Sequence, residues 1–112
     1  LALHYSQQKC NLLIYPSAFS AVTGPKYWEL LQRARAVDTQ SFVISCSPAV
    51  NEHGDFESYG HSMVVNPDGT IMNTINGTHE DIMVVDLDLN LVEKERQRIP
   101  ILKKKKNNSY SF

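Results

Sequence analysis

The chain of 112 residues has only two cysteines and four histidines. Neither Cys10 nor Cys46 has a second cysteine or a histidine at the spacing of a metal site. The histidines are spread over different parts of the chain: His4, His53, His61 and His79. This scarcity argues against a zinc centre and gives a disulfide no support. We expect two buried free thiols and no bound metal.

The chain also lacks a strong charge of either sign, a long apolar run and a signal peptide. Its formal net charge is −1, so nothing general favours binding to nucleic acid, and no run is long enough to cross a bilayer. We expect no nucleic-acid or membrane partner, and a cytoplasmic location with the mitochondrion as the alternative. Four consecutive lysines at 103–106 predict a solvated basic tail over 103–112, after a domain that spans 1–102.

No residue type stands in a pattern that would make it catalytic. There is no glycine-rich phosphate loop. A cysteine nucleophile needs a base or a cation beside it. Lys9 precedes Cys10, but neighbours in an extended segment point to opposite faces. Cys46 falls in an apolar strand pattern, where burial would keep the thiol protonated and inert. We therefore assign no catalytic residue to this chain.

Two apolar runs, at 12–15 and 41–46, predict buried strands, the first covered on both faces. Between them, Thr23-Gly24-Pro25 predicts the start of a helix, because proline suits the first helical position and Thr23 or Gly24 can cap it. This helix is expected to end near Asp38-Thr39. Its apolar face is predicted to hold Trp28, Leu31, Ala34 and Val37, with Leu30 beside them.

The second half of the chain reads as further strands and one helix. Residues 61–65 and 70–75 predict a hairpin around Asn66-Pro67-Asp68-Gly69, since proline presets φ and glycine accepts a positive φ. The alternation over 82–88 predicts another strand, and 89–98 a short helix capped by Asn90 and ended by Pro100. The order of elements predicts an α/β fold with a mixed sheet covered by helices.

The loop after the first strand is the one predicted pocket wall. Ligands of α/β proteins bind at loops that follow the carboxyl ends of strands. The loop offers Ser17, Ala18, Phe19 and Thr23 as candidate binding residues. The alternative is structural, with Phe19 packed in the core and Thr23 capping the helix.

Several stretches together carry a family resemblance. They are 12–19 (Leu-Leu-Ile-Tyr-Pro-Ser-Ala-Phe), 23–25 (Thr-Gly-Pro), 28–38 (Trp-Glu-Leu-Leu-Gln-Arg-Ala-Arg-Ala-Val-Asp), 47–49 (Ser-Pro-Ala), 59–62 (Tyr-Gly-His-Ser), 64–67 (Val-Val-Asn-Pro), Gly69, 96–97 (Arg-Gln) and 99–100 (Ile-Pro). They resemble the C-terminal half of the nitrilase, or carbon–nitrogen hydrolase, superfamily, and within it the omega-amidase or nitrilase-like branch. The similarity covers nearly the whole chain.

This resemblance implies an αββα sandwich, of which the chain would supply one part. It also implies a Glu base, a Lys that stabilises the tetrahedral intermediate and a Cys nucleophile, with no metal or organic cofactor. The first residues resemble the later part of the helix that follows the nucleophile, so all three groups would precede Leu1. Since the chain begins without Met inside this helix pattern, we expect it to be a piece of a longer enzyme.

The resemblance further implies roles for the loop and the long helix. Ala18 and Phe19 would face the substrate chain, Thr23 would hydrogen-bond its distal carboxylate, and Ser17 is a weaker candidate. Trp28, Arg33 and Arg35 would be structural or interface residues of a homodimer, in which the long helix and the helix ending near Gln8 meet a second subunit.

The full-length protein is thus expected to hydrolyse the terminal amide of short dicarboxylic acid monoamides, such as alpha-ketoglutaramate, through a Cys thioester. One alternative is a truncated, non-catalytic module that binds a partner through the helix over 25–38. The other is a different amide or nitrile hydrolase of the family. Alone, the chain is predicted to be inactive and aggregation-prone, because one sheet face and the dimer helices would be exposed.

Overall fold

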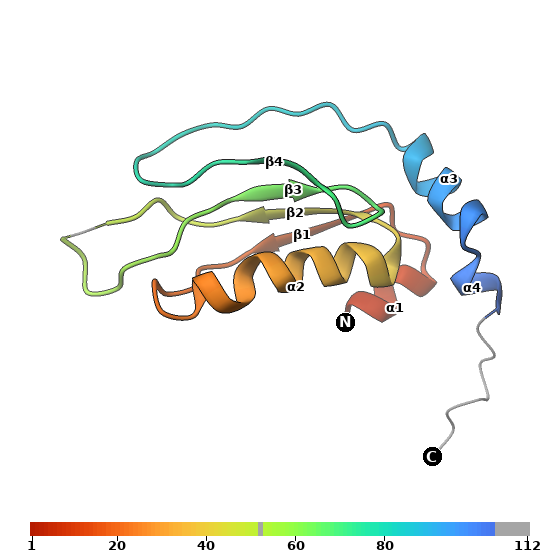
Figure 1. The fold of residues 1–112 in the computed structure, drawn as a ribbon, viewed down its shortest axis with the longest axis horizontal. Coiled ribbons are helices and arrows are strands. Elements are labelled where there is room, and N and C mark those ends of the chain that lie inside the picture. The colour runs from red at the N-terminus through yellow and green to blue at the C-terminus, as the bar shows by residue number, and fades with distance from the viewer. Residues whose placement is uncertain (52, 105–112) are drawn as a thin grey trace, which may run out of the picture.

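A computed structural model of the chain describes residues 1–51 and 53–104, with side chains as far as residue 102 (Figure 1). Its elements follow the predicted order with one exception among the strands. They are α1 (Ala2–Gln7), β1 (Leu12–Pro16), α2 (Gly24–Thr39), β2 (Phe42–Cys46), β3 (Met63–Val65), β4 (Ile71–Thr74), α3 (Asn90–Arg98) and α4 (Ile101–Lys104). None of the described helices is long and apolar enough to cross a membrane.

The four strands form one mixed sheet in the order β1-β2-β3-β4. β1 and β2 run parallel, with Leu13 opposite Val43, whereas β2, β3 and β4 are antiparallel neighbours. α2 is the crossover between the two parallel strands, as Figure 1 shows. This arrangement confirms the predicted α/β class with a mixed sheet.

The core lies between the sheet and α2. Its buried side chains come from three strands and one helix: Leu13, Val43, Met63, Val65, Trp28 and Ala36. Trp28, Gln32 and Ala36 are all buried on α2 and stand four residues apart, so they share one side of the helix.

The predicted apolar face of α2 was therefore wrong for most of its members. Only Trp28 of that set is fully buried, while Leu31 and Val37 are exposed and Leu30 keeps 64% of its surface. The side of α2 that carries Trp28, Gln32 and Ala36 packs against the sheet, whereas Leu30, Leu31 and Val37 are exposed.

The second face of the sheet is exposed along β1 and at the end of β2, whereas Phe42 and Val64 on the same face are buried. Ile14 keeps 62% of its surface, and Cys46, which the sequence predicted to be buried, is exposed. Both lie on the opposite face from Leu13 and Val43, because side chains alternate along a strand. In the described residues a helix covers only one face of β1, so the prediction of cover on both faces was wrong here.

The β3–β4 hairpin is confirmed. Gly69 adopts φ +89°, the conformation that its position in the turn requires. The turn closes through hydrogen bonds from Gly69 N to Asn66 O at 2.9 Å and from Asn66 N to Thr70 O at 2.8 Å.

Residues 82–88 do not form the predicted strand. The segment is the long uncoiled stretch between β4 and α3 in Figure 1, and its backbone joins no strand in the described part of the chain. Ile82 and Val84 keep 85% and 84% of their surface, while Met83 and Val85 between them are half-buried. The alternation was read correctly, but a strand also needs a neighbour with free backbone groups.

α3 contacts the segments just before β1 and β2, at the end of the sheet where these two strands begin. Arg96 Nη2 donates to Cys10 O at 2.7 Å, and Gln40 Nε2 donates to Ile99 O at 2.8 Å. The predicted cap was wrong, since Asn90 is the first residue of α3 and Leu89 is its N-cap. Asp88 Oδ1 accepts from Asn90 N at 3.0 Å. Pro100 follows the end of α3 as expected, and most of the predicted basic tail, residues 105–112, lies outside the described residues.

Candidate functional site

The loop over 17–23 begins at the carboxyl end of β1, beside the end of the parallel strand β2. Ser17 N donates to Cys46 O at 3.0 Å, which extends the β1–β2 pairing by one residue into the loop. Farther along, Ala21 N donates to Glu57 O at 3.1 Å, and Ser20 pairs with Ser58 in an isolated antiparallel bridge. The loop is thus held from two sides, at the place where sequence reasoning put the pocket wall.

Thr23 occupies the N-cap position of α2, one of the two predicted, but its side chain makes no capping hydrogen bond, and Ser20 holds the turn before the helix instead. Ser20 Oγ accepts from the backbone N–H of Thr23 at 3.1 Å and of Val22 at 3.3 Å. The hydroxyl of Thr23 lies 3.1 Å from the same oxygen and is exposed. Since Ser20 serves the helix start, the Thr23 hydroxyl is not committed to capping.

The four predicted binding residues lie together on this loop. Ala18 and Thr23 are exposed, whereas Ser17 and Phe19 are half-buried. Phe19 packs edge-to-face against Trp28, with ring centres 5.2 Å apart and planes at 70°. Its backbone oxygen accepts from Tyr59 N at 2.8 Å. Phe19 therefore takes part in packing and also borders the exposed part of the loop.

Sequence reasoning missed the segment that supports this loop, residues 58–62. Ser58 Oγ is buried, lies 3.1 Å from Ser47 Oγ and donates to Pro48 O at 3.2 Å. Ser62 Oγ accepts from Ser47 N at 2.9 Å. The signal in the sequence is the run Tyr59-Gly60-His61-Ser62, which stands between a charged loop and a strand.

Tyr15 on β1 lies close to the loop and has a perturbed pKa. Burial raises the pKa of the Tyr15 hydroxyl, and the positive charge of Arg35 partly opposes that rise. Within residues 1–51 and 53–104, no cluster of three His, Cys, Asp or Glu side chains could hold a metal ion. The described loop can therefore bind and orient a ligand through hydroxyls, backbone and an aromatic ring.

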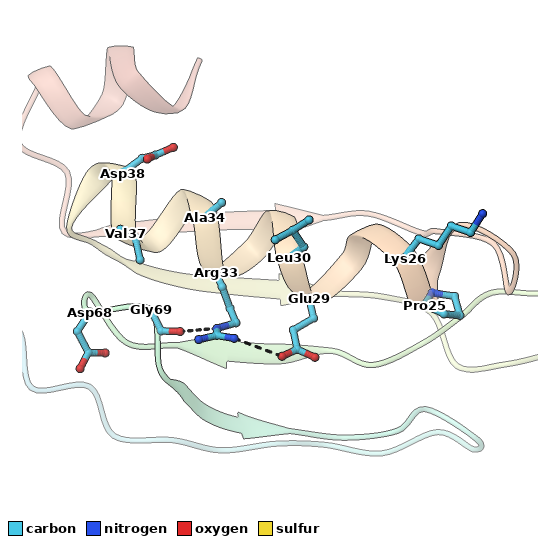
Figure 2. Close-up of a pocket in the computed structure, with 10 residues that line it drawn as sticks. All are labelled: Pro25, Lys26, Glu29, Leu30, Arg33, Ala34, Val37, Asp38, Asp68 and Gly69. Carbon is cyan, nitrogen blue, oxygen red and sulfur yellow. Dashed lines mark hydrogen bonds and ion pairs between the residues drawn. The ribbon is translucent and has the colours of Figure 1, made fainter.

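A groove of about 550 Å³ lies elsewhere, between the outer side of α2 and the tip of the β3–β4 hairpin (Figure 2). Arg33 crosses it, donating from Nε to Gly69 O at 2.8 Å, with Nη1 at 3.7 Å from Glu29 Oε1. The groove is open to solvent and lies off the strand ends. We regard it as part of the surface of α2 and not as the substrate pocket.

The residues predicted for a dimer interface fall in two environments. Arg33 is exposed and Arg35 half-buried, and Arg35 Nη1 donates to Asp38 Oδ2 at 3.2 Å on the same helix. Trp28 has no exposed surface, so it has nothing to present to a second subunit. Its burial argues against the interface role and for a role beneath the loop.

Comparison with known proteins defines the class to which this sheet, helix and loop belong. The sequence profile described as carbon-nitrogen hydrolase matches residues 1–97, and the chain belongs to this family. Within it, the chain is similar to the omega-amidase-like branch of the nitrilase superfamily. It is 49% identical over 111 residues to the mouse (Mus musculus) protein named Omega-amidase NIT2, covering 99% of this chain and 40% of that protein.

Two further relatives agree. Nitrilase homolog 2 of Dictyostelium discoideum is 47% identical over 112 residues, covering all of this chain and 34% of that protein. The crystal structure of Saccharomyces cerevisiae Nit3, described as a member of branch 10 of the nitrilase superfamily, superposes with a TM-score of 0.88 at 40% identity. That match covers 97% of this chain and 39% of Nit3. The chain thus spans 34–40% of the length of these relatives.

Proposed function

We propose that the full-length protein containing this chain is an omega-amidase-like hydrolase. Its substrates would be short dicarboxylic acid monoamides of the alpha-ketoglutaramate type, and its product the free dicarboxylic acid. The observation that carries the proposal is 49% identity to a protein named Omega-amidase NIT2, across a region that includes the strand-end loop.

The chemistry assigned to the whole protein is thiol-dependent amide hydrolysis. A Cys thiolate attacks the amide carbon, the C–N bond breaks, and the nitrogen leaves as ammonia after taking a proton from a general acid. Water then attacks the thioester, which releases the carboxylic acid and restores the thiol. The Cys, Glu and Lys that do this lie, in this proposal, in the part of the relatives' length that the chain does not span.

The contribution of this chain is substrate recognition by the loop after β1. The exposed hydroxyl of Thr23 would donate to the distal carboxylate, with Ala18 and Phe19 beside the short carbon chain and Ser17 next to them. A short loop with one aromatic ring and few hydroxyls suits a small, polar substrate.

The first test measures ammonia release by the full-length protein from alpha-ketoglutaramate, from longer monoamides and from nitriles. The proposal expects the highest kcat/KM for the short monoamide. Thr23→Val should raise KM for it roughly tenfold, because a hydrogen bond to a charged group is lost. Thr78→Val, in the turn after β4, is the matched control and should behave as wild type.

The same assay separates the alternatives. Preferred hydrolysis of a nitrile, or of an amide without a distal carboxylate, would favour a different hydrolase of the family. A full-length product without ammonia release from any substrate, and without a Cys shortly before Leu1, would favour a non-catalytic module that binds a partner.

We also propose that the protein forms a homodimer through the outer sides of α1 and α2. Leu30 keeps 64% of its surface, and Leu31 and Val37 are exposed on the same helix. Leu3 on α1 and Leu1 just before it are exposed as well. Neighbouring exposed apolar side chains of this kind favour a protein interface. Light scattering of the full-length protein should give twice the monomer mass, and Leu30→Glu should halve it. Lys94→Glu on α3 is the control and should leave the mass unchanged.

A further inference from the structure

The loop over 17–23 rests on a closed chain of contacts that passes through Trp28. The Trp28 side chain has no exposed surface and lies edge-to-face against Phe19, with ring centres 5.2 Å apart. Such aromatic pairs have a preferred geometry, so the indole ring limits where the Phe19 ring can lie. This is the first link from α2 to the loop.

The second link runs from Trp28 to the supporting segment. Its indole Nε1–H donates to His61 O at 2.7 Å. His61 adopts φ +63°, a left-handed conformation that is unfavourable for a residue with a side chain. A buried hydrogen bond to its carbonyl helps to hold that conformation, because breaking it would leave the indole N–H without a partner.

The third link returns to the loop. The His61 ring stacks on Tyr59 with centres 3.8 Å apart and planes at 11°, and His61 Nδ1 donates to Tyr59 O at 2.6 Å. Tyr59 N then donates to Phe19 O at 2.8 Å. The contacts therefore run from the Phe19 ring through Trp28, His61 and Tyr59 to the Phe19 backbone.

We propose that Trp28 is a positioning residue that fixes the Phe19 ring and thereby the conformation of the substrate-binding loop. It does so by contacting Phe19 directly and by donating a hydrogen bond to the His61 carbonyl. Trp28 does not touch the substrate in this proposal, which rests on the proposed function of the loop. Trp28 has no exposed surface in the described residues, and the proposal gives it no part in the chemistry. Its loss should therefore weaken substrate recognition and leave the chemical step intact.

The test uses Trp28→Phe in the full-length protein, since phenylalanine keeps an aromatic ring but has no N–H to donate. KM for the short monoamide should rise roughly fivefold, the factor expected for one lost hydrogen bond, with kcat unchanged. Trp28→Leu, which also removes the aromatic contact, should raise KM further. Tyr27→Phe, at the neighbouring exposed position on α2, is the matched control and should change neither constant.

A second readout does not depend on activity. Amide hydrogen exchange of peptides covering 17–23 and 57–62 should accelerate in Trp28→Phe, while peptides from β3 and β4 exchange as in wild type. Unchanged exchange in both loop peptides would overturn the positioning role, and so would a fall in kcat at constant KM. If the wild type hydrolyses no monoamide, the proposed function fails, and the exchange result alone still decides whether Trp28 orders the loop.

Discussion

The two faces of β1 differ strongly in how far their side chains are buried. Leu13 and Ile14 are consecutive and both apolar, yet Leu13 keeps 7% of its surface and Ile14 keeps 62%. Leu13 packs under α2 with Val43 and Trp28, whereas Ile14 lies on the opposite face of β1 and is exposed. On β2 the contrast is only partial, because exposed Cys46 shares its face with Phe42, which is fully buried.

This difference shows that the apolar sequence of β1 suits burial on both faces, whereas the described part of the chain buries only one. A strand buried on one face alternates apolar and polar residues, and a strand buried on both is apolar throughout. β1 is apolar throughout, like a strand buried on both faces, but only one of its faces is buried in the described residues. The family resemblance implies an αββα sandwich, and the chain spans 40% of the length of the mouse relative. We therefore expect a second sheet of the full-length protein to cover Ile14.

The largest effect is expected on the covered face. Leu13→Ala should lower the free energy of unfolding by about 2–5 kcal/mol, because it leaves a cavity between β1 and α2 that the core cannot refill. Urea denaturation of the full-length protein should show a lower midpoint with an unchanged slope.

Ile14→Ala is the matched variant on the open face and breaks the comparison if our reading is wrong. In the full-length protein the urea midpoint of this variant should fall nearly as far as that of Leu13→Ala, because we expect a second sheet to bury Ile14. A loss of stability of no more than about 0.5 kcal/mol, as for exposed positions, would show that no second layer covers this face.

The contrast between the faces also explains what could be predicted from the sequence. The strands at β1 and β2, the helix from Gly24 to Thr39 and the hairpin at Gly69 were predictable, because each depends on local pattern and on turn chemistry. The strand expected at 82–88 was not found, and Ile14 and Cys46 were expected to be buried. These errors share a cause, since pairing and cover depend on partners that a local pattern does not contain.

For the candidate site, the sequence predicted the loop but not what holds it. Phe19 and Thr23 could be singled out because they follow a strand and precede a helix. The contacts of Trp28 with Phe19 and His61 could not, since they join residues up to 33 positions apart. The cap position at Thr23 was predictable from Thr-Gly-Pro, whereas the hydrogen bonds from Val22 N and Thr23 N to Ser20 Oγ depend on the turn that precedes the helix.

A smaller effect is expected where α2 begins, and it measures how tightly the covered side is packed. A Cβ added to Gly24 would overlap the Tyr59 ring. Gly24→Ala should therefore lower stability by about 1–3 kcal/mol through overpacking, although alanine is the better helix former. The measurement is again the urea midpoint. Ala21→Gly, which makes the reverse exchange of alanine for glycine in the neighbouring exposed loop, serves as the comparison variant. A stabilised Gly24→Ala would show that Tyr59 moves aside freely and that the loop support is loose.

The smallest effect on stability is expected at the tip of the β3–β4 hairpin, which belongs to neither face of β1. Hydrogen bonds from the hydroxyl and backbone N–H of Thr70 hold the pKa of Asp68 below its ordinary value. A carboxyl whose pKa is lower in the folded state stabilises the fold above its unfolded pKa of about 4, and that contribution disappears as pH falls through the folded pKa. Asp68→Asn should thus cost less than about 1 kcal/mol at pH 7, because the group is exposed to water. The gap between wild type and variant should narrow below pH 4 in urea midpoints recorded from pH 7 to pH 2. A gap that stays constant over this range would mean that the charge of Asp68 contributes nothing to the turn.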